Sequence, residues 1–453
     1  MNKELKLLPA VLATGIMAFA GVLIETAMNV TFPTLMTEFK ISTSGVQWVT
    51  TIYLLVISII VPLSTYLLKN ISLRHLFLTA NLFFILGLVI DYRSPNFTFL
   101  LIGRLAQGIS TGIALPLMFH IILTYSPLEK RGAMIGLGNL TTSIAPAIGP
   151  TYGGILTSTT GWKAIFLFLI PILLLALVVG LKAIPSLPVS KTSTMDWFSL
   201  LGIALMFSGF LLFLEQLTSL TGIVALLVGI GGFILFYQRS VSARNPLIHL
   251  QVMKNAAYRR FLLGFLLCQC LLLAISFVLP NFVQIVLKKD AFTAGLMMLP
   301  GAAVGAILAP LSGRLLDHIG PKKPIISGLL LAAIGWFGLL WLVGSPVLLG
   351  FVAGHVFYMI GIGLSYSNLM TTGLSALPQA AYTDGNAIFN TLQQFAGAVA
   401  TALAATVINQ AQRHATDFQQ GTIFGSQLVL GSLLVLLLLV LLLVTIQFHK
   451  DPR

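Results

Sequence analysis

The stretch from Leu428 to Ile446 reads LVLGSLLVLLLLVLLLVTI and contains neither a charged residue nor a proline. An apolar run of about 18 residues or more is long enough to cross, as a helix, the roughly 30 Å hydrocarbon layer of a bilayer. Charged residues make up 8% of the 453-residue chain and apolar residues make up 57%, whereas soluble domains are about 25% charged. This composition predicts an integral membrane protein.

Similar apolar runs follow one another along the chain. Isolated runs of this length can only be helices in lipid, because a helix satisfies its backbone hydrogen bonds internally. We therefore predict an all-α integral membrane protein with 14 transmembrane helices. The predicted spans cover residues 9–30, 46–68, 73–92, 97–125, 131–157, 162–182, 197–217, 221–238, 261–287, 291–316, 323–343, 347–374, 384–412 and 424–447.

The net charge of +13 comes from 25 Lys and Arg residues that are scattered in twos and threes between the apolar runs. Scattered charges do not form the basic patch that binding of nucleic acid requires. Lys and Arg concentrate in loops that stay in the cytoplasm, and their distribution over alternate loops predicts that both termini are cytoplasmic. We expect a monomeric, multi-pass protein of the cell (inner or plasma) membrane, with the lipid bilayer and no nucleic acid as partner.

The chain lacks the sequence patterns of enzymes and of cofactor sites. It has no G-x-x-x-x-G-K-S/T nucleotide loop, no Cys/His spacing for a metal and no nucleophile elbow with a suitable set of partners. Cys268 and Cys270 lie in one apolar run, where we interpret them as packing residues. We expect no enzymatic activity, no cofactor and no metal, so any energy that the protein uses must come from a gradient or a partner.

A weak internal repeat divides the chain. The tripeptide Pro-Leu-Ser closes the second predicted span at residues 62–64 and the tenth at residues 310–312, and a basic loop follows each. Such repeats are typical of transporters that are built from related bundles. We predict a six-helix bundle over residues 1–190, an inserted helix pair over residues 191–255 and a second, pseudo-symmetric six-helix bundle over residues 256–453.

The loop after the tenth predicted span, residues 313–323, reads GRLLDHIGPKK. It resembles the loop signature G-x-L-x-D-x-x-G-x-K/R-K/R of the 14-span drug/proton antiporter branch of the major facilitator superfamily, and the resemblance covers nearly the whole chain. The equivalent first loop departs from the signature, with Thr65, Lys69 and Ser72 in place of Gly, Asp and Gly. The resemblance implies a gating and loop-motif role for Gly313, Arg314, Asp317, Gly320, Lys322, Lys323 and Arg74.

Two further motifs carry the resemblance. Residues 104–108 (RLAQG) are similar to the branch's R-x-x-Q-G element, and residues 145–154 (APAIGPTYGG), with Gly136 upstream, resemble its antiporter signature. Within the branch the second motif is associated with export, while generic packing of small residues between helices is the alternative. The antiporter helix motif comprises Gly136, Pro146, Gly149, Pro150, Gly153 and Gly154.

Glu25 is the carboxyl group that we predict to lie deepest in the membrane, because the other acidic residues except Glu215 fall in loops or at span ends, Asp91 among them. We expect Arg104 at a similar depth, facing a carboxylate or an aqueous cavity, with snorkelling to the interface as the alternative. We predict that Glu25 carries the proton, since loss of water favours its neutral form while Arg104 or a cationic substrate favours its charged form. A Glu–Arg pair that only fixes helix packing is the alternative.

Polar residues inside the predicted spans are candidates for the lining of a substrate cavity. They are Asn29, Gln107, His355, Asn390, Gln393 and Gln394. For His355 a hydrogen bond to a neighbouring helix is the alternative. The resemblance implies a proton-coupled antiporter that exports small lipophilic or cationic compounds, as in multidrug efflux, by alternating access. A dedicated exporter of one metabolite, peptide or lipid precursor, and a membrane sensor that has lost transport, are the competing interpretations.

Overall fold

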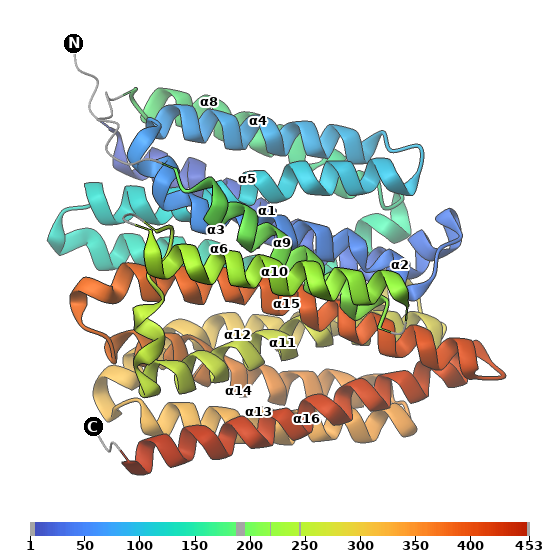
Figure 1. Ribbon diagram of the computed structural model, residues 1–453. Helices are drawn as coiled ribbons and strands as arrows, with labels where there is room; N and C mark the ends of the chain where they lie inside the picture. Colours follow the sequence, from blue (N-terminus) through green and yellow to red (C-terminus); the bar gives the residue numbers. More distant parts are fainter. Residues whose placement is uncertain (1–4, 187–194, 218, 244–245, 451–453) are drawn as a thin grey trace.

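Helices make up nearly the whole structure. The computed structural model describes residues 5–186, 195–217, 219–243 and 246–450, and no strand occurs in these ranges. Fourteen long helices lie side by side in one bundle (Figure 1). They are α1 (Leu7–Phe39), α3 (Trp48–Asn70), α4 (Leu73–Tyr92), α5 (Phe97–Tyr125), α6 (Leu128–Thr159), α8 (Leu169–Ala183), α9 (Trp197–Glu215), α10 (Leu220–Ser242), α11 (Ala256–Ile285), α12 (Ala291–Ile319), α13 (Lys322–Gly344), α14 (Leu348–Ser375), α15 (Tyr382–His414) and α16 (Phe418–Lys450).

The helices match the predicted spans. Among the described residues, 13 helical segments are long and apolar enough to cross a membrane, and α6, which has some side chains outside the description, is the fourteenth long helix. The prediction of an all-α membrane protein with 14 spanning helices is confirmed. Four short elements were not predicted, namely α2 (Thr43–Val46), α7 (Ala164–Leu167) and the 3-10 helices η1 (Leu250–Lys254) and η2 (Gln379–Ala381).

The described part of the chain begins and ends at the same end of the helix bundle (Figure 1). The start of α1 and the end of α16 lie at the same end, at the left of Figure 1, which we call the termini side. The connections from α1 to α2, from α4 to α5 and from α11 to α12 lie at the other end, which we call the far side. An even number of spanning helices requires this arrangement.

Buried apolar side chains form two separate clusters. Most residues of one cluster come from α1 to α8, and most residues of the other come from α9 to α16. The expected boundary between residues 190 and 191 lies outside the described residues, so the division of the chain at residues 1–190, 191–255 and 256–453 stays a prediction.

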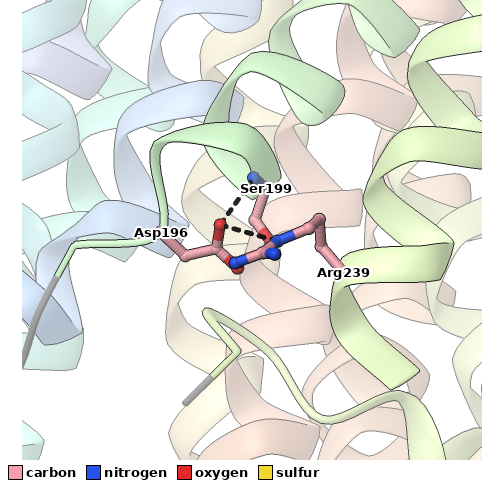
Figure 2. Close-up of polar contacts among 3 residues, drawn as sticks. All are labelled: Asp196, Ser199 and Arg239. Atoms are coloured by element: carbon pink, nitrogen blue, oxygen red, sulfur yellow. Dashed lines mark hydrogen bonds and ion pairs between the residues drawn. The ribbon is translucent and has the colours of Figure 1, made fainter. Parts of the chain in front are cut away.

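Helices α9 and α10 pack against each other along glycines. A Cβ atom on Gly202 would lie 2.8 Å from the backbone nitrogen of Phe236 in α10, so the two backbones are in direct contact. At the start of α9, Asp196 accepts hydrogen bonds from the backbone N–H (3.2 Å) and the hydroxyl (2.7 Å) of Ser199. The same carboxylate pairs with Arg239 of α10 at 3.1 Å, as Figure 2 shows. The N-terminal cap of one helix therefore also ties it to the next.

The turn between α12 and α13 depends on one glycine. Gly320 follows the last residue of α12 with a φ of +78°, a backbone conformation that residues with a Cβ atom rarely adopt. Gly313, inside α12, has open space around the position of a Cβ atom. Of the two signature glycines, only Gly320 is thus required by the local backbone.

Candidate functional site

Arg104 of α5 is completely buried. Its Nε atom donates to the carbonyl oxygen of Val49 (2.9 Å) and its Nη1 atom donates to Oε1 of Gln107 (2.7 Å). The guanidinium carbon lies 4.2 Å from the centre of the Tyr53 ring, and the Tyr53 hydroxyl donates to Thr111 at 2.8 Å. A charge held in this way does not reach the membrane interface, so the alternative of a snorkelling Arg104 is excluded.

Asp91 is a second buried carboxylate that the sequence analysis missed. It is the last but one residue of α4 and so lies at the end of a span, as predicted. Its exposed fraction is nevertheless 0%. Its Oδ2 atom accepts a 2.7 Å hydrogen bond from Nε2 of Gln107, and its Oδ1 atom has no hydrogen-bond partner among the described residues. Asp91 thus lies at a span end, as predicted, and its burial was not predicted; that Glu25 lies deepest in the membrane stays a prediction.

Close packing of α4 on α5 explains why Asp91 is buried. A Cβ atom on Gly103 would overlap Oδ1 of Asp91, and a Cβ atom on Gly87 would lie 2.7 Å from the carbonyl oxygen of Gly103. Gly87 precedes Asp91 by one helical turn and so lies on the same face. This spacing of a glycine and an acid near a span end is the sequence signal that could have found Asp91.

Glu25 of α1 is 8% exposed and lies next to the Arg104 cluster without contacting it directly. Gly21, one turn earlier on the same face, lies so close to α5 that a Cβ atom would be 2.5 Å from the hydroxyl of Thr111. Among the described residues no ion pair within 4.0 Å and no hydrogen bond involves the Glu25 side chain. The predicted Glu25–Arg104 pair is thus not formed in this structure, and the proton-carrying role of Glu25 stays a prediction.

Asn29 lies one turn beyond Glu25 and is 1% exposed. Its side-chain oxygen accepts a 2.9 Å hydrogen bond from the Thr50 hydroxyl of α3, while its Nδ2 atom has no partner among the described residues. Buried amide groups are normally paired, so this unpaired donor is an exception, and the role of Asn29 in a substrate cavity stays a prediction.

The polar residues predicted on α15 have separate environments. Gln393 donates to the Tyr366 hydroxyl (2.7 Å), which in turn donates to Gln269 (2.5 Å). The Tyr366 ring stacks on Phe265, with 4.4 Å between ring centres. Gln394 is half-buried, and Asn390 donates to the Asn386 carbonyl oxygen of its own helix. Gln393 thus belongs to a group of amides and aromatic rings from α11, α14 and α15.

His355 of α14 is 2% exposed and packs against Gly301 of α12, where a Cβ atom would overlap its ring. Its Nδ1 atom has no hydrogen-bond partner among the described residues. The alternative of a helix–helix hydrogen bond through Nδ1 is therefore not seen. In the described part of the chain, no group of three or more His, Cys, Asp and Glu residues is placed to hold a metal ion.

The glycines of the antiporter helix motif form a seam with two other helices. A Cβ atom on Gly153 would overlap the carbonyl oxygen of Ala27 in α1, and one on Gly154 would overlap that of Ala291 in α12. A Cβ atom on Gly149 would likewise overlap the Thr26 side chain. Helix α6 passes through Pro146 and Pro150 as one continuous helix. The surroundings of Gly136 lie outside the described residues.

Hydrogen bonds that join the first helices to the last ones gather toward the far side. Thr43 donates to Gln412 (2.6 Å), and Gln284 donates to the carbonyl oxygen of Val30 (2.8 Å). Ser158, at the end of α6, accepts from the backbone N–H of Phe292 at the start of α12 (3.0 Å). The two sets of helices are therefore held together at this end.

Two cavities among the described residues lie between different sets of helices. One, of about 580 Å³, opens on the far side and is lined by residues of α1, α2, α11, α15 and α16, with Lys288 and Arg413 as its charged groups. The other, of about 310 Å³, separates Ile144 of α6 from Ile307 and Arg314 of α12. Helices α6 and α12, which touch at Gly154, are thus separated further toward the termini side.

The loop-motif residues lie at the surface on the termini side. Arg314, Asp317, Lys322 and Lys323 are exposed, and Arg74 at the start of α4 is half-buried. Among the described residues, no ion pair involves any of them. Their gating role stays a prediction.

A bundle of 14 spanning helices, with buried charged groups and with cavities between its first and last helices, defines a polytopic membrane transport protein. Residues 14–401 match the family model of the Major Facilitator Superfamily, and the chain belongs to this family of membrane transporters.

Relatives and solved structures agree with this family. The chain is 36% identical over 425 residues to the "Lincomycin resistance protein LmrB" of Bacillus subtilis (strain 168), covering 91% of this chain and 87% of that protein. It is 25% identical to the "Riboflavin transporter RibZ" of Clostridioides difficile (strain 630), covering 89% of each. A solved bacterial homologue of the human lysosomal transporter Spinster has the same fold, with a TM-score of 0.69 at 14% identity over 96% of this chain and 95% of that one.

Proposed function

We propose that this chain is a proton-coupled antiporter of the cell membrane that exports small lipophilic or cationic compounds. The observation that carries the proposal is the burial of Glu25 beside the Arg104 cluster without an ion pair between them. An ionised carboxylate in such a place is costly unless a cation compensates it. Either a proton or a cationic substrate supplies that compensation, and the two compete for one group.

The helix arrangement supports alternating access. Hydrogen bonds between Thr43 and Gln412 and between Phe292 and Ser158 join the first helices to the last ones at the far side, and a cavity lies between α6 and α12 toward the termini side. If the transporter opens to one side of the membrane at a time, competition between a proton and a substrate for one carboxylate results in their exchange across the membrane. With both termini in the cytoplasm, as the distribution of Lys and Arg predicts, these hydrogen bonds lie toward the outside.

The cargo follows from the residues around the two carboxylates and on α15. Asn29 near Glu25, the Tyr366–Gln393 group and Gln394 offer amides and aromatic rings, which suit an amphiphilic compound with a cationic group. The amide of Gln107 already binds Arg104 and Asp91. The similarity to the lincomycin resistance protein of Bacillus subtilis favours drug efflux. A dedicated exporter of one metabolite is the second candidate, and the riboflavin transporter among the relatives favours it.

Transport in proteoliposomes tests the proposal. A pH gradient is imposed, and uptake of a panel of lipophilic cations, neutral drugs and riboflavin is compared between the native protein, Glu25→Gln and Glu215→Gln. We expect proton-driven transport of several compounds that Glu25→Gln abolishes and Glu215→Gln, at the end of α9, retains. Transport by folded Glu25→Gln with unchanged dependence on the gradient would contradict the role of Glu25. Transport of one compound alone would favour the dedicated exporter, and no transport by the native protein would favour a sensor.

A further inference from the structure

The buried cluster beside α1 contains one guanidinium group and two carboxyl groups. Gln107 stands between Arg104 and Asp91, accepting from the guanidinium at 2.7 Å and donating to the carboxylate at 2.7 Å. Its amide dipole therefore has its negative end at the cation and its positive end at the anion. We propose that Asp91 is the permanent counter-ion of Arg104, and that Glu25 is thereby left free to exchange a proton for a substrate cation. The inference rests on the antiport proposed above.

Charge balance is the physical reason for this arrangement. Arg104 and Asp91 are both 0% exposed and form no direct ion pair within 4.0 Å among the described residues, so the amide of Gln107 connects the two buried charges. With Arg104 neutralised by Asp91, the remaining carboxyl of Glu25 leaves the cluster without net charge in two states. In one it is protonated, and in the other it is ionised beside a cationic substrate.

Without Asp91, the charge balance of the cluster would differ. Arg104 would then need the negative charge of Glu25, because no other carboxylate lies next to it among the described residues. A proton could not bind to Glu25 without leaving a bare buried cation, and a substrate cation would be repelled. Asp91 is therefore a positioning residue, which acts on the exchange through Arg104.

The groups that face the two carboxyls determine what a variant changes. Arg104 of α5, Tyr53 of α3 and Tyr366 of α14 are close enough to Glu25 to interact with it electrostatically. Asp91 faces Arg104, and beyond the end of its helix the Lys163 ammonium donates to the carbonyl oxygen of Ser94 at 2.9 Å. Replacing Asp91 leaves all the others in place, so the change at Glu25 reports the loss of one negative charge.

Infrared spectroscopy of the purified protein tests the inference without any substrate. The absorption of protonated carboxyl groups is titrated with pH in the native protein and in Glu25→Gln, and their difference isolates Glu25. The same subtraction is made between Asp91→Asn and the double variant Asp91→Asn/Glu25→Gln. We expect the midpoint of the Glu25 signal to fall by about one pH unit or more in the Asp91→Asn background, as a nearby unpaired cation requires.

Gln107→Met is a second variant that keeps both charged groups and removes the bridge between them. We expect its Glu25 midpoint to move in the same direction by a smaller amount. If Asp91→Asn does not fold, this variant tests whether Asp91 is the counter-ion of Arg104. An unchanged or higher midpoint in a folded variant overturns the counter-ion role and leaves the antiport proposal standing. Absence of a Glu25 signal in the native protein overturns both.

Discussion

The Thr43 hydroxyl donates a 2.6 Å hydrogen bond to the side-chain oxygen of Gln412, which joins α2 to the end of α15. Gln412 also donates to Thr422 of α16 at 2.9 Å, so one amide connects three helices. Thr43 and Gln412 are 2% and 8% exposed, and a hydrogen bond that is shielded from water is costly to lose. This pair therefore stabilises the contact between the first and the last helices at the far side.

Replacing Thr43 by valine should open the far side. Valine keeps the shape and removes the donor, which leaves a buried acceptor unpaired at a cost of about 1–3 kcal/mol. We expect a cysteine introduced at Asn409, on the wall of the far-side cavity, to react with a thiol reagent about tenfold faster in Thr43→Val. Thr37→Val is the control, because the Thr37 hydroxyl bonds only to Pro33 of its own helix among the described residues. Equal labelling rates in both variants would show that the pair does not hold the gate.

Alanine at Gly153 should be far more harmful than alanine at Gly313. The new Cβ atom would overlap the Ala27 carbonyl oxygen, which is backbone and cannot turn away, whereas Gly313 has open space at the same position. Overpacking of this kind costs about 1–3 kcal/mol, while Gly→Ala inside a helix gains about 1 kcal/mol. Thermal unfolding of the purified variants should give a lower midpoint for Gly153→Ala and an equal or higher one for Gly313→Ala. Similar midpoints would mean that α6 can move away from α1 freely.

The ring of Tyr53, more than its hydroxyl, should support Arg104. Tyr53→Phe keeps the aromatic face below the guanidinium and loses only the hydrogen bond to Thr111, while Tyr53→Leu loses both. A desolvated contact between a cation and an aromatic ring is worth about 2 kcal/mol, so we expect Tyr53→Leu to be less stable than Tyr53→Phe by about that amount. Chemical unfolding followed by tryptophan fluorescence measures the difference. Equal stability of the two variants would assign the whole effect to the hydroxyl.

The Asp196 cap should contribute to stability at neutral pH and lose its effect in acid. Partial burial raises the pKa of Asp196, but hydrogen bonds from Ser199 and Arg239 outweigh it and hold the pKa below 3.8. A group with a lowered folded-state pKa stabilises above its unfolded pKa, about 3.9, and the contribution disappears as the pH falls through the folded value. We expect Asp196→Ala to lower the free energy of unfolding by about 1 kcal/mol between pH 5 and 8.

Two matched variants separate the cap from the ion pair. Asp196→Asn keeps a capping oxygen and Arg239→Gln keeps the cap intact, so both should cost less than Asp196→Ala. The ion pair contributes little, because Arg239 is 41% exposed and water screens it. The measurement is the unfolding temperature as a function of pH. A native–Asp196→Ala difference that persists undiminished below the folded pKa of Asp196 would contradict this assignment.

Hydropathy predicted the helices because every helical segment that crosses lipid must be long and apolar. The expected spans 73–92 and 97–125 coincide with α4 and α5. Helix α16 begins at Phe418, six residues before the expected start at residue 424, because polar residues can continue a helix beyond the apolar layer. The interruption at Phe168, which separates α7 from α8, lies inside a wholly apolar run and gives no hydropathy signal.

The candidate site was predicted in part. Motif and depth were enough to find Arg104, Gln107 and Glu25, which are all buried in the structure. Asp91 was missed because depth was measured along the chain from the nearest span end, whereas burial depends on how closely α4 and α5 approach each other. The contact between Gly103 and the Asp91 carboxylate is tertiary, and hydropathy does not encode it.

The glycine contacts of α6 with α1 and α12, which form a joint between these helices, have a consequence for how such a protein could evolve. What Gly149, Gly153 and Gly154 require is the absence of a Cβ atom, since backbone or a neighbouring helix occupies its place. Outward-facing positions of the same helix, such as Ile148 and Ile155, are each 41% exposed and carry no such restriction. Mutations that alter the chemistry of the polar groups on α1, α5 and α15 can therefore accumulate without rebuilding the joint. Under the proposed function, a lineage of such proteins would change what it recognises while conserving the contacts of α6.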